Sequence, residues 1–395
     1  MNMQMNCLTH ISVDMSNTKI TFYPVKNGDT NLIEFSDGAI MLIDCKFRSE
    51  AEEDNDDYDV INDLLTNKLK TKEKGLPYLN AFVLTHPDQD HCLGFAKKFF
   101  LNKNPETAAP TKEEKDSKLI LVGELWYSPR VFTEHEDDLS EDAKSFKKEA
   151  ERRMKLWKNN DATKNKPGNR IRIIGYSDVD DLNGIPDECI SAAGDEICKM
   201  DGKERTKYRF FIHSPFKNSI EGDSRNETSI VMQIRVDADG SKDAGKLFFG
   251  GDAEWRVWKK IQEKTSDKKN LEWNLFEAPH HCSYTFFSDD RDSEPEESSL
   301  NFLDNRVGNG YIVSSSKTIK KNNDNPPCQK AKNRYIQKLD DDDDYFKCTE
   351  ENEKQDPVVF EIKSDGIWFD SSFPSAISNW LLSAKPYASL VWATR

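Results

Sequence analysis

Four potential metal ligands lie within six residues of one another: His86, Asp88, Asp90 and His91. Carboxylates crowded in this way repel one another and raise each other's pKa. A divalent cation removes the conflict, because it binds deprotonated carboxylates and neutral imidazoles. The spacing therefore predicts a metal centre. The plainer alternative is a polar loop that carries two incidental histidines.

Two later stretches have a similar layout, in which an apolar run leads directly into a metal-binding side chain. Residues 248–252 read FFGGD and end in Asp252. Residues 278–283 read APHHCS and contain His280 and His281. A strand that stops at a ligand holds that ligand on a rigid element, which suits a site that needs defined geometry.

These three stretches resemble the motifs of the metallo-β-lactamase fold. HPDQDH at 86–91 resembles H-x-[HD]-x-D-H, and its second-position Asp resembles the hydrolase domain of the DNA-uptake protein ComEC. FFGGD is similar to the strand ending in T-G-D, and APHHCS is similar to V-P-H-H-G-S. The resemblance runs from about residue 20 to residue 370. It implies an α/β fold, an α/β/β/α sandwich of two mixed sheets.

The resemblance also implies a site for two divalent metal ions, Zn²⁺ or Mn²⁺. The implied ligands are His86 and Asp88 for one ion, Asp90, His91 and His281 for the other, and Asp252 between the two. Either neighbouring histidine could be the last ligand. His281 is favoured by analogy with the ligand that precedes Gly in the family, which leaves His280 behind the ligands or facing the substrate. Cys282 replaces that Gly and is an alternative thiolate ligand.

Asn226 occupies the place where most of the family has a histidine, as in the ComEC-like branch. The first metal would then have a weak amide ligand or none, and a single-metal enzyme is the alternative. A site richer in oxygen shifts preference from Zn²⁺ toward Mn²⁺. Asp44, at the end of an apolar run, matches a family carboxylate that orients ligands, although it could equally cap the strand exit.

The resemblance implies a phosphodiesterase, most simply a nuclease, that uses a metal-activated hydroxide. Bound metals lower the pKa of a shared water toward ~7, and Asp90 could orient that water. Stand-alone proteins similar to this domain suggest an effector in bacterial antiviral defence. The alternatives are hydrolysis of small nucleotides or of carboxylic or thioesters, because one fold hosts several chemistries. A metal-binding interaction subunit with little catalysis is a third reading.

Composition limits the partners. The 395 residues carry a net charge of -15, which argues against broad nucleic-acid binding but not against a nuclease with a local basic groove. No apolar run approaches the ~20 residues of a membrane helix. The N-terminus lacks a basic region before an apolar core, as a signal peptide would have. Eight scattered cysteines without a C-x-x-C pair read as reduced thiols, so a cytoplasmic protein is expected.

The elements that must position these residues follow from periodicity. We expect one hydrolase domain over 1–370, with insertions at about 103–170 and 183–207, and an apolar tail over 371–395 that docks on the body or on a protein partner. Strands are predicted at 19–23, 30–34, 39–43, 81–84, 118–127, 170–174, 208–213, 245–251, 271–278 and 310–316, and helices at 52–72, 92–101, 139–159, 254–263 and 330–338. A closing hairpin is predicted at 358–363 and 366–370. His213 is predicted to be structural, and the acidic run 340–344 an exposed loop.

Overall fold

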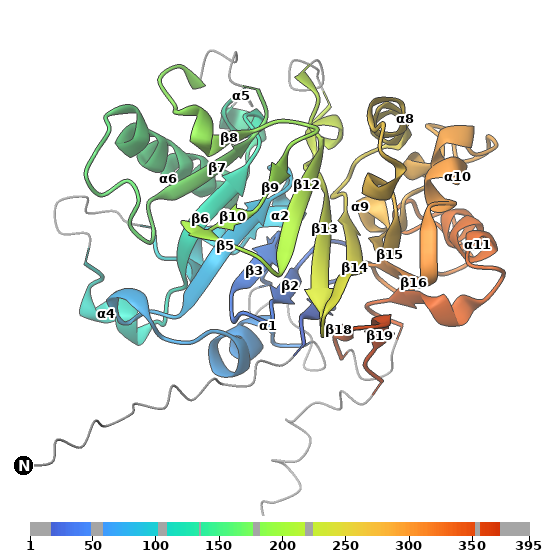
Figure 1. Ribbon diagram of the computed structural model, residues 1–395, viewed down its shortest axis with the longest axis horizontal. Coiled ribbons are helices and arrows are strands. Elements are labelled where there is room, and N and C mark those ends of the chain that lie inside the picture. The colour runs from blue at the N-terminus through green and yellow to red at the C-terminus, as the bar shows by residue number, and fades with distance from the viewer. Residues whose placement is uncertain are drawn as a thin grey trace, which may run out of the picture.

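The computed structural model describes residues 17–48, 58–101, 109–133, 136–176, 182–217, 224–351 and 356–371. Two large mixed sheets pack face to face at its centre, and helices cover their outer faces (Figure 1). Within these ranges, none of the helices combines the length and apolar character needed to cross a bilayer.

The first sheet is antiparallel on one side and parallel on the other. Within the described residues it has nine strands in the order β19 (Gly366–Phe369), β18 (Val358–Lys363), β1 (Lys19–Phe22), β2 (Asn31–Glu34), β3 (Ile40–Ile43), β5 (Tyr78–Leu84), β6 (Leu121–Tyr127), β7 (Arg170–Ile174) and β8 (Ile190–Ser191). Pairing is antiparallel from β19 to β3 and parallel from β3 to β8. The predicted hairpin of β2 and β3 is confirmed, since the two strands pair in register.

The second sheet also has a parallel part and an antiparallel part. In the described part of the chain it has seven strands, β17 (Phe346–Cys348), β16 (Arg306–Ser314), β15 (Trp273–Glu277), β14 (Ser241–Phe249), β13 (Val231–Ala238), β12 (Tyr208–Ser214) and β9 (Glu196–Ile197). Strands β14 to β17 are parallel and the others antiparallel. Residues 183–207 supply β8 to the first sheet and β9 to the second, and also form the small hairpin of β10 (Lys199–Met200) and β11 (Lys203–Glu204).

Three apolar clusters define the layers. The central one packs inner-face side chains of the first sheet, such as Phe22 and Val83, against those of the second, such as Ile234 and Leu275. A second cluster joins the outer face of the first sheet to α6 (Glu141–Lys158). The third joins the outer face of the second sheet to α8 (Trp255–Lys264), α10 (Glu297–Leu303) and α11 (Gln329–Lys338). The layer order is therefore helix, sheet, sheet, helix, as the sequence predicted.

Helix α6 shows how the sequence builds an outer layer. The Ser140 side chain accepts a hydrogen bond from the backbone N–H of Ala143, which caps the first turn. Its apolar side chains recur at helical spacing and are buried: Ala143, Phe146, Ala150, Met154 and Trp157. Arg153 is also buried, and it donates hydrogen bonds to the carbonyls of Val122 and Arg170, both at 3.1 Å. The helix is thereby tied to two neighbouring strands.

The predicted helix over 92–101 is wrong. The chain instead forms two short helices, α2 (Gln89–Cys92) and α3 (Phe95–Lys98), and is extended at Phe99. Gly94 separates them with a φ of 90°, and a Cβ there would lie 2.8 Å from the Cβ of Phe47. Only glycine tolerates both the backbone angle and this contact. The short strand β4 (Cys45–Lys46) makes bridges beside this break.

Other predicted elements are shorter than expected or lie outside the described residues. The helix predicted over 52–72 begins at Val60 as α1 (Val60–Asp63), continues as a π-helical turn (Leu64–Lys68) and ends there, while residues 49–57 are outside the described ranges. The tail from 372 is also outside them. The remaining helices of the described residues are α4 (Lys112–Asp116), α5 (Arg130–Thr133) and α9 (Pro279–Cys282). Short 3-10 turns lie at Glu73–Gly75, Glu136–Asp138, Asp187–Cys189, Asn226–Thr228, Lys268–Asn270, Tyr284–Phe286 and Asp343–Tyr345.

Candidate metal centre

The three motif stretches converge at one edge of the sandwich. Strands β3 and β5 are parallel, so Asp44 and the loop that begins at Thr85 leave the first sheet at the same edge. Strands β14 and β15 are also parallel, and their ends deliver Asp252 and the two histidines of α9. The backbone N–H of Ile230 donates to the carbonyl of Thr85 at 3.1 Å, which joins the two sheets at this edge.

Gly251 allows the two sheets to approach closely here. Its φ is 47°, and a Cβ at this position would lie 2.8 Å from the hydroxyl oxygen of Thr85. Its carbonyl accepts a hydrogen bond from the N–H of His280 at 3.0 Å. Glycine therefore brings Asp252 of the second sheet against the histidine loop of the first.

Asp252 lies at the middle of the cluster and presents a different oxygen to each half. Its Oδ1 is 3.1 Å from Nε2 of His91 and 3.7 Å from Nε2 of His281. Its Oδ2 is 3.7 Å from Nε2 of His86 and 3.5 Å from Nε2 of His280. A carboxylate placed in this way can serve two groups of ligands at once.

Two sets of ligand atoms are close enough to share an ion. Those of His86, His91 and Asp252 lie within 4.8 Å of one another, and so do those of Asp90, His91 and His281. In the second set, Nε2 of His281 is 3.3 Å from Oδ2 of Asp90. Asp29 joins further groups with these residues. The described residues therefore contain His/Asp clusters that could hold a metal ion.

Several buried ligand atoms of the cluster have no hydrogen-bond partner, which indicates that a cation would fit between them. Nε2 of His86, His91 and His281 and Oδ1 of Asp252 are all buried, and none of them has a hydrogen-bond partner. Leaving a buried polar atom unpaired costs about 1–3 kcal/mol, so four that converge on one place need a partner. Three imidazole nitrogens and a carboxylate oxygen are ligands that Zn²⁺ and Mn²⁺ both accept. The residues present fit a divalent transition metal.

The Nδ1 atoms of His91 and His86 have hydrogen-bond partners on the far side of each ring. Nδ1 of His91 lies 2.7 Å from Oδ2 of Asp44, and Asp44 in turn accepts hydrogen bonds from the N–H and hydroxyl of Thr85. Nδ1 of His86 lies 3.1 Å from the hydroxyl of Thr85. These partners turn Nε2 of His86 and of His91 toward the cluster and make each a better ligand. Nδ1 of His281 lies 3.4 Å from Oδ1 of Asp29, within ion-pair distance but without a hydrogen bond. The predicted orienting role of Asp44 agrees with this geometry.

Electrostatics concentrate negative charge at the cluster. Burial would lower the pKa of His281, but the carboxylates of Asp252 and Asp29 outweigh it and raise the pKa to about 10. Asp252 and Asp44 likewise raise the pKa of His91 against the effect of burial. Burial would raise the pKa of Asp252, yet the surrounding histidines hold it well below its usual value. The carboxylates therefore favour binding of positive charge at the cluster, either as protons on the histidines or as a metal ion.

Asp88 and Asp90 lie on the more open side. The Asp88 side chain is 30% exposed, with Oδ2 3.6 Å from Nε2 of His86 and Oδ1 accepting from Nη1 of Arg225 at 2.6 Å. Burial raises the pKa of Asp88, but His86 and Arg225 together lower it to about 2. The pKa of Asp90 is also lowered, since His281 and His91 outweigh its burial. Both carboxylates are ready to bind a cation at neutral pH.

Asn226 follows Arg225, the residue that bonds Asp88, but its own side chain bonds a residue outside the cluster. It begins a 3-10 turn, and its Nδ2 donates to Oε1 of Glu254 at 3.2 Å. Burial, opposed by this hydrogen bond, raises the pKa of Glu254. The predicted role of Asn226 as a weak ligand or a catalytic group stays a prediction.

The two adjacent histidines are separated by an unusual backbone. His280, His281 and Cys282 have φ values of 51°, 52° and 65°, a left-handed run that costs energy in residues with a Cβ. It turns His281 into the buried cluster and leaves His280 at the rim, with Nδ1 3.2 Å from the hydroxyl of Thr285. Cys282 instead packs in the outer apolar cluster, with Sγ 3.9 Å from the carbonyl of Cys328. The alternative of a thiolate ligand is therefore wrong.

Sequence reasoning missed three residues of this site: Asp29, Thr85 and Glu277. Glu277 is buried at the end of β15, where its Oε1 accepts from Nδ2 of Asn31 at 2.6 Å and from the hydroxyl of Ser315 at 3.0 Å. Burial and the nearby charge of Asp29 raise its pKa well above the usual value. The sequence signal that could have identified Glu277 is its place at the end of an apolar strand, three residues before His280.

No family model matches the chain, and no curated protein is similar enough to it to be counted as a relative. The assignment of the centre therefore rests on the geometry of these residues.

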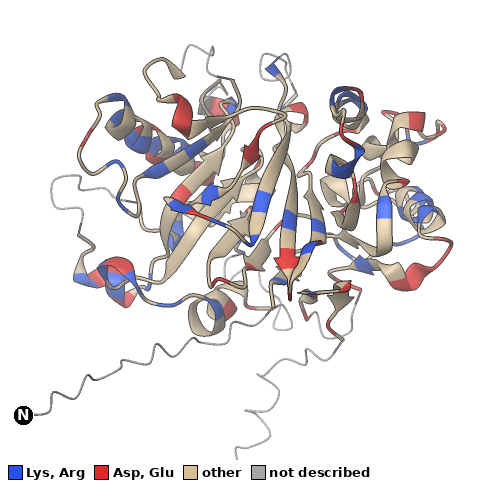
Figure 2. Ribbon diagram, in the orientation of Figure 1, with Lys and Arg blue, Asp and Glu red and all other residues tan. Residues whose placement is uncertain are grey.

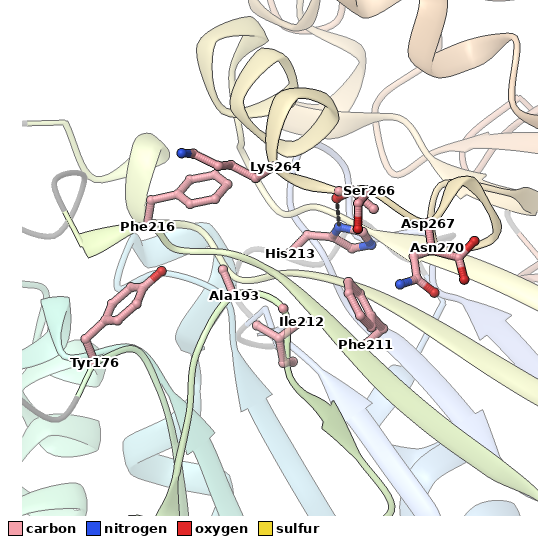
Figure 3. Close-up of a pocket in the computed structure, with 12 residues that line it drawn as sticks. Tyr176, Ala193, Phe211, Ile212, His213, Phe216, Lys264, Ser266, Asp267 and Asn270 are labelled. Atoms are coloured by element: carbon pink, nitrogen blue, oxygen red, sulfur yellow. Dashed lines mark hydrogen bonds between the residues drawn. The ribbon is translucent and has the colours of Figure 1, made fainter.

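His213 lies apart from the centre, in agreement with its predicted structural role. It borders a separate hollow of about 510 Å³, where Tyr176 and Phe216 lie on one side and Asp267 and Asn270 on the other (Figure 3). Nδ1 of His213 is 3.4 Å from the hydroxyl of Thr265. Burial lowers the pKa of His213 to about 3, so the ring is neutral at physiological pH.

Proposed function

We propose that this chain is a metal-dependent hydrolase that cleaves phosphodiester bonds, and that it uses a centre for two divalent ions, Zn²⁺ or Mn²⁺. The observation that carries the proposal is the set of buried, unpaired atoms that converge from His86, His91, His281 and Asp252. A site of this composition, open on one side at Asp88 and His280, is typical of metal-assisted hydrolysis.

The resemblance of the motifs to the metallo-β-lactamase fold and to ComEC-type domains supports the same reaction class. Two mixed sheets between helical layers are compatible with that fold. One fold hosts several chemistries, so the residues of the site decide the substrate class. The predicted role in bacterial antiviral defence rests on the resemblance alone.

Each residue of the centre has a distinct task in this mechanism. Bound divalent ions would polarise the scissile phosphoryl group, lower the pKa of water and stabilise charge on the leaving oxygen. His86, His91, His281 and Asp252 would hold the ions, and Asp88 and Asp90 would complete the ligand set. Asp44 fixes the orientation of the His91 imidazole through Nδ1, and Asp29 lies 3.4 Å from Nδ1 of His281.

Residues at the rim would act on the substrate. The His280 side chain is 22% exposed, and its Nε2 lies 3.5 Å from Oδ2 of Asp252 at the open side of the cluster. From this position it can donate a hydrogen bond to a substrate oxygen. Asp90, whose side chain is 37% exposed, can orient the attacking water. Thr285 holds the His280 ring in place through Nδ1.

The test is cleavage of single- and double-stranded DNA and RNA by metal-stripped protein supplemented with Mn²⁺, Zn²⁺ or Mg²⁺. Wild type should cleave at least one substrate, and both His86→Ala and Asp252→Ala should reduce cleavage by about a thousandfold or more. His213→Gln is the matched control, because it removes a buried imidazole outside the centre.

Equal cleavage by wild type and Asp252→Ala would point to a contaminating nuclease and contradict the proposal. Tight metal binding without turnover of any phosphodiester would favour an interaction subunit. Turnover of carboxylic or thioesters alone would retain the metal centre and reject the substrate class.

A further inference from the structure

We propose that a lysine-bearing hollow next to the metal centre binds a second phosphate of the substrate, so that the preferred substrate is a polynucleotide strand. The inference deepens the proposed function and rests on it. The hollow has a volume of about 560 Å³, and its basic lining residues are Lys26, Lys317 and Lys320. Asn27, Thr318 and Pro326 also line this hollow.

The hollow shares one wall with the centre. Asn27 lines it and lies two residues before Asp29, which stands behind His281. The backbone N–H of Asp29 donates to the carbonyl of Asp90 at 3.3 Å. Lys46 donates from Nζ to the carbonyl of Asn27, and burial lowers its pKa while attraction to Asp90 opposes that shift. The hollow and Asp90 therefore flank the same short segment.

A second wall is shared through the loop after β16. Nδ2 of Asn27 donates to the carbonyl of Pro326 at 3.1 Å, and Oδ1 of Asn27 accepts from the N–H of Lys317 at 3.1 Å. Next to Pro326, Oδ1 of Asn325 accepts from the hydroxyl of Ser283, two residues after His281. The lysine loop is thus fixed to the histidine loop by hydrogen bonds.

The positive charge of this loop stands out in an acidic chain. Residues 317–321 read KTIKK, and Lys317, Lys320 and Lys321 are exposed, although the whole chain carries a net charge of -15. Acidic residues of the chain lie on many other loops (Figure 2). Arg48 and Lys317 also lower the pKa of Lys46 by repulsion, which shows that basic groups gather at this wall.

Two carboxylates, Asp324 and Glu350, line the hollow together with the lysines. Oε1 of Glu350 accepts from the backbone N–H of Lys26 at 2.8 Å, and Oδ2 of Asp324 accepts from Nδ2 of Asn322 at 2.6 Å. Both are engaged by the wall itself, whereas Lys317 and Lys320 are exposed and can follow an anion. A neutral ester has no use for such a site, but the phosphate that flanks a scissile phosphodiester does.

The experiment compares substrates of different length. We would measure kcat/KM for a single-stranded oligonucleotide and for a dinucleotide that contains one phosphodiester bond, with wild type and with K317A/K320A. The ratio of kcat/KM for the long substrate to that for the dinucleotide should fall about tenfold in the variant. The salt slope for oligonucleotide binding should decrease by about one for each lysine removed. K112A/K115A, on the exposed helix α4, is the control and should keep the wild-type ratio.

The outcomes separate the two proposals. Wild-type cleavage with an unchanged ratio in K317A/K320A would overturn the phosphate subsite and leave the phosphodiesterase standing. Failure of wild type to cleave either substrate with any metal would overturn both. If the kcat/KM ratio falls as expected and wild type prefers RNA over DNA, or the reverse, the result would support the subsite and identify the kind of strand that it binds.

Discussion

At the scale of single residues, the centre depends on side chains that never need to touch a metal. Asp44 is fully buried, contacts Nδ1 of His91 at 2.7 Å and accepts two hydrogen bonds from Thr85. Burial raises its pKa, although His91 opposes the shift. Its negative charge keeps Nε2 of His91 directed at Asp252, so the charge of Asp44 acts on the centre through the ring.

Asp44→Asn should therefore weaken metal binding with little change in fold. We expect the affinity for Mn²⁺ or Zn²⁺ to fall about 10- to 100-fold, as for other partners of ligand histidines. Titration of stripped protein in competition with a chelator measures this, and circular dichroism checks the fold. Asp37→Asn, in the turn between β2 and β3, should bind metal like wild type. Equal affinities for the Asp44 and Asp37 variants would refute the orienting role.

His213 gives a prediction on pH. Its pKa is about 3 in the folded chain and about 6.5 in the unfolded one, so only the unfolded state gains its proton between these values. Stability from this residue is therefore complete above about pH 6.5 and is lost as pH falls toward 3. From pH 7.5 to pH 5, wild type should lose about 2 kcal/mol more than His213→Gln. Urea unfolding at both pH values measures the free energy of unfolding of each protein. Equal losses of stability in wild type and His213→Gln would contradict a buried neutral His213.

At the scale of elements, α6 holds its sheet through a buried ion pair. Arg153 is 1% exposed, its Nε lies 2.8 Å from Oε1 of Glu149, and Arg152 also bonds Glu149. Burial lowers the pKa of Arg153, and Glu149 opposes this shift. Removing the carboxylate would leave a buried guanidinium with only backbone carbonyls as partners.

Glu149→Ala should consequently destabilise the chain by about 3–5 kcal/mol, because it breaks a buried pair from one side. Glu141→Ala is the matched control on the same helix, since Glu141 pairs with Lys144 but is 89% exposed. That exposed pair should contribute little to the free energy of unfolding, because water and salt screen it. Chemical denaturation of both variants gives the comparison, and similar losses would show that burial of the pair is unimportant.

At the scale of the whole molecule, the centre joins the two sheets. His86 and His91 follow a strand of the first sheet, whereas Asp252 and His281 follow strands of the second. An ion bound by both sets stabilises the folded chain and has no equivalent site in the unfolded one. Metal binding should therefore appear as global stability.

Mn²⁺ or Zn²⁺ at 100 times its Kd should stabilise the stripped protein by about 2.7 kcal/mol, which a thermal shift detects. Asp252→Asn should lose most of this shift, because Asp252 faces both groups of ligands. A chelator should reverse the wild-type shift. An unchanged shift in Asp252→Asn would place the metal elsewhere, for example on the exposed acidic run at Asp342, Asp343 and Asp344.

The sequence by itself determined the local parts of this protein. Apolar runs followed by candidate metal ligands located β5, β14 and β15 and the cluster residues after them, since each signal lies within a few neighbouring residues. The turn at Asp37 and Gly38 likewise specified the hairpin of β2 and β3. Alternation of these strands with amphipathic helices indicated a layered architecture, and the resemblance of the motifs supplied most of the support for two sheets between helices.

The tertiary structure alone decided which distant residues complete the site. Glu277 meets Asn31 across 246 residues of sequence, and Asp29 reaches His281 from the opposite sheet. The break at Gly94 also depends on tertiary structure, because Phe47 packs where a Cβ would lie, in addition to the local preference of glycine for a positive φ. Periodicity records the neighbours of a residue along one element, whereas packing between the two sheets sets the partners of its charged and polar atoms.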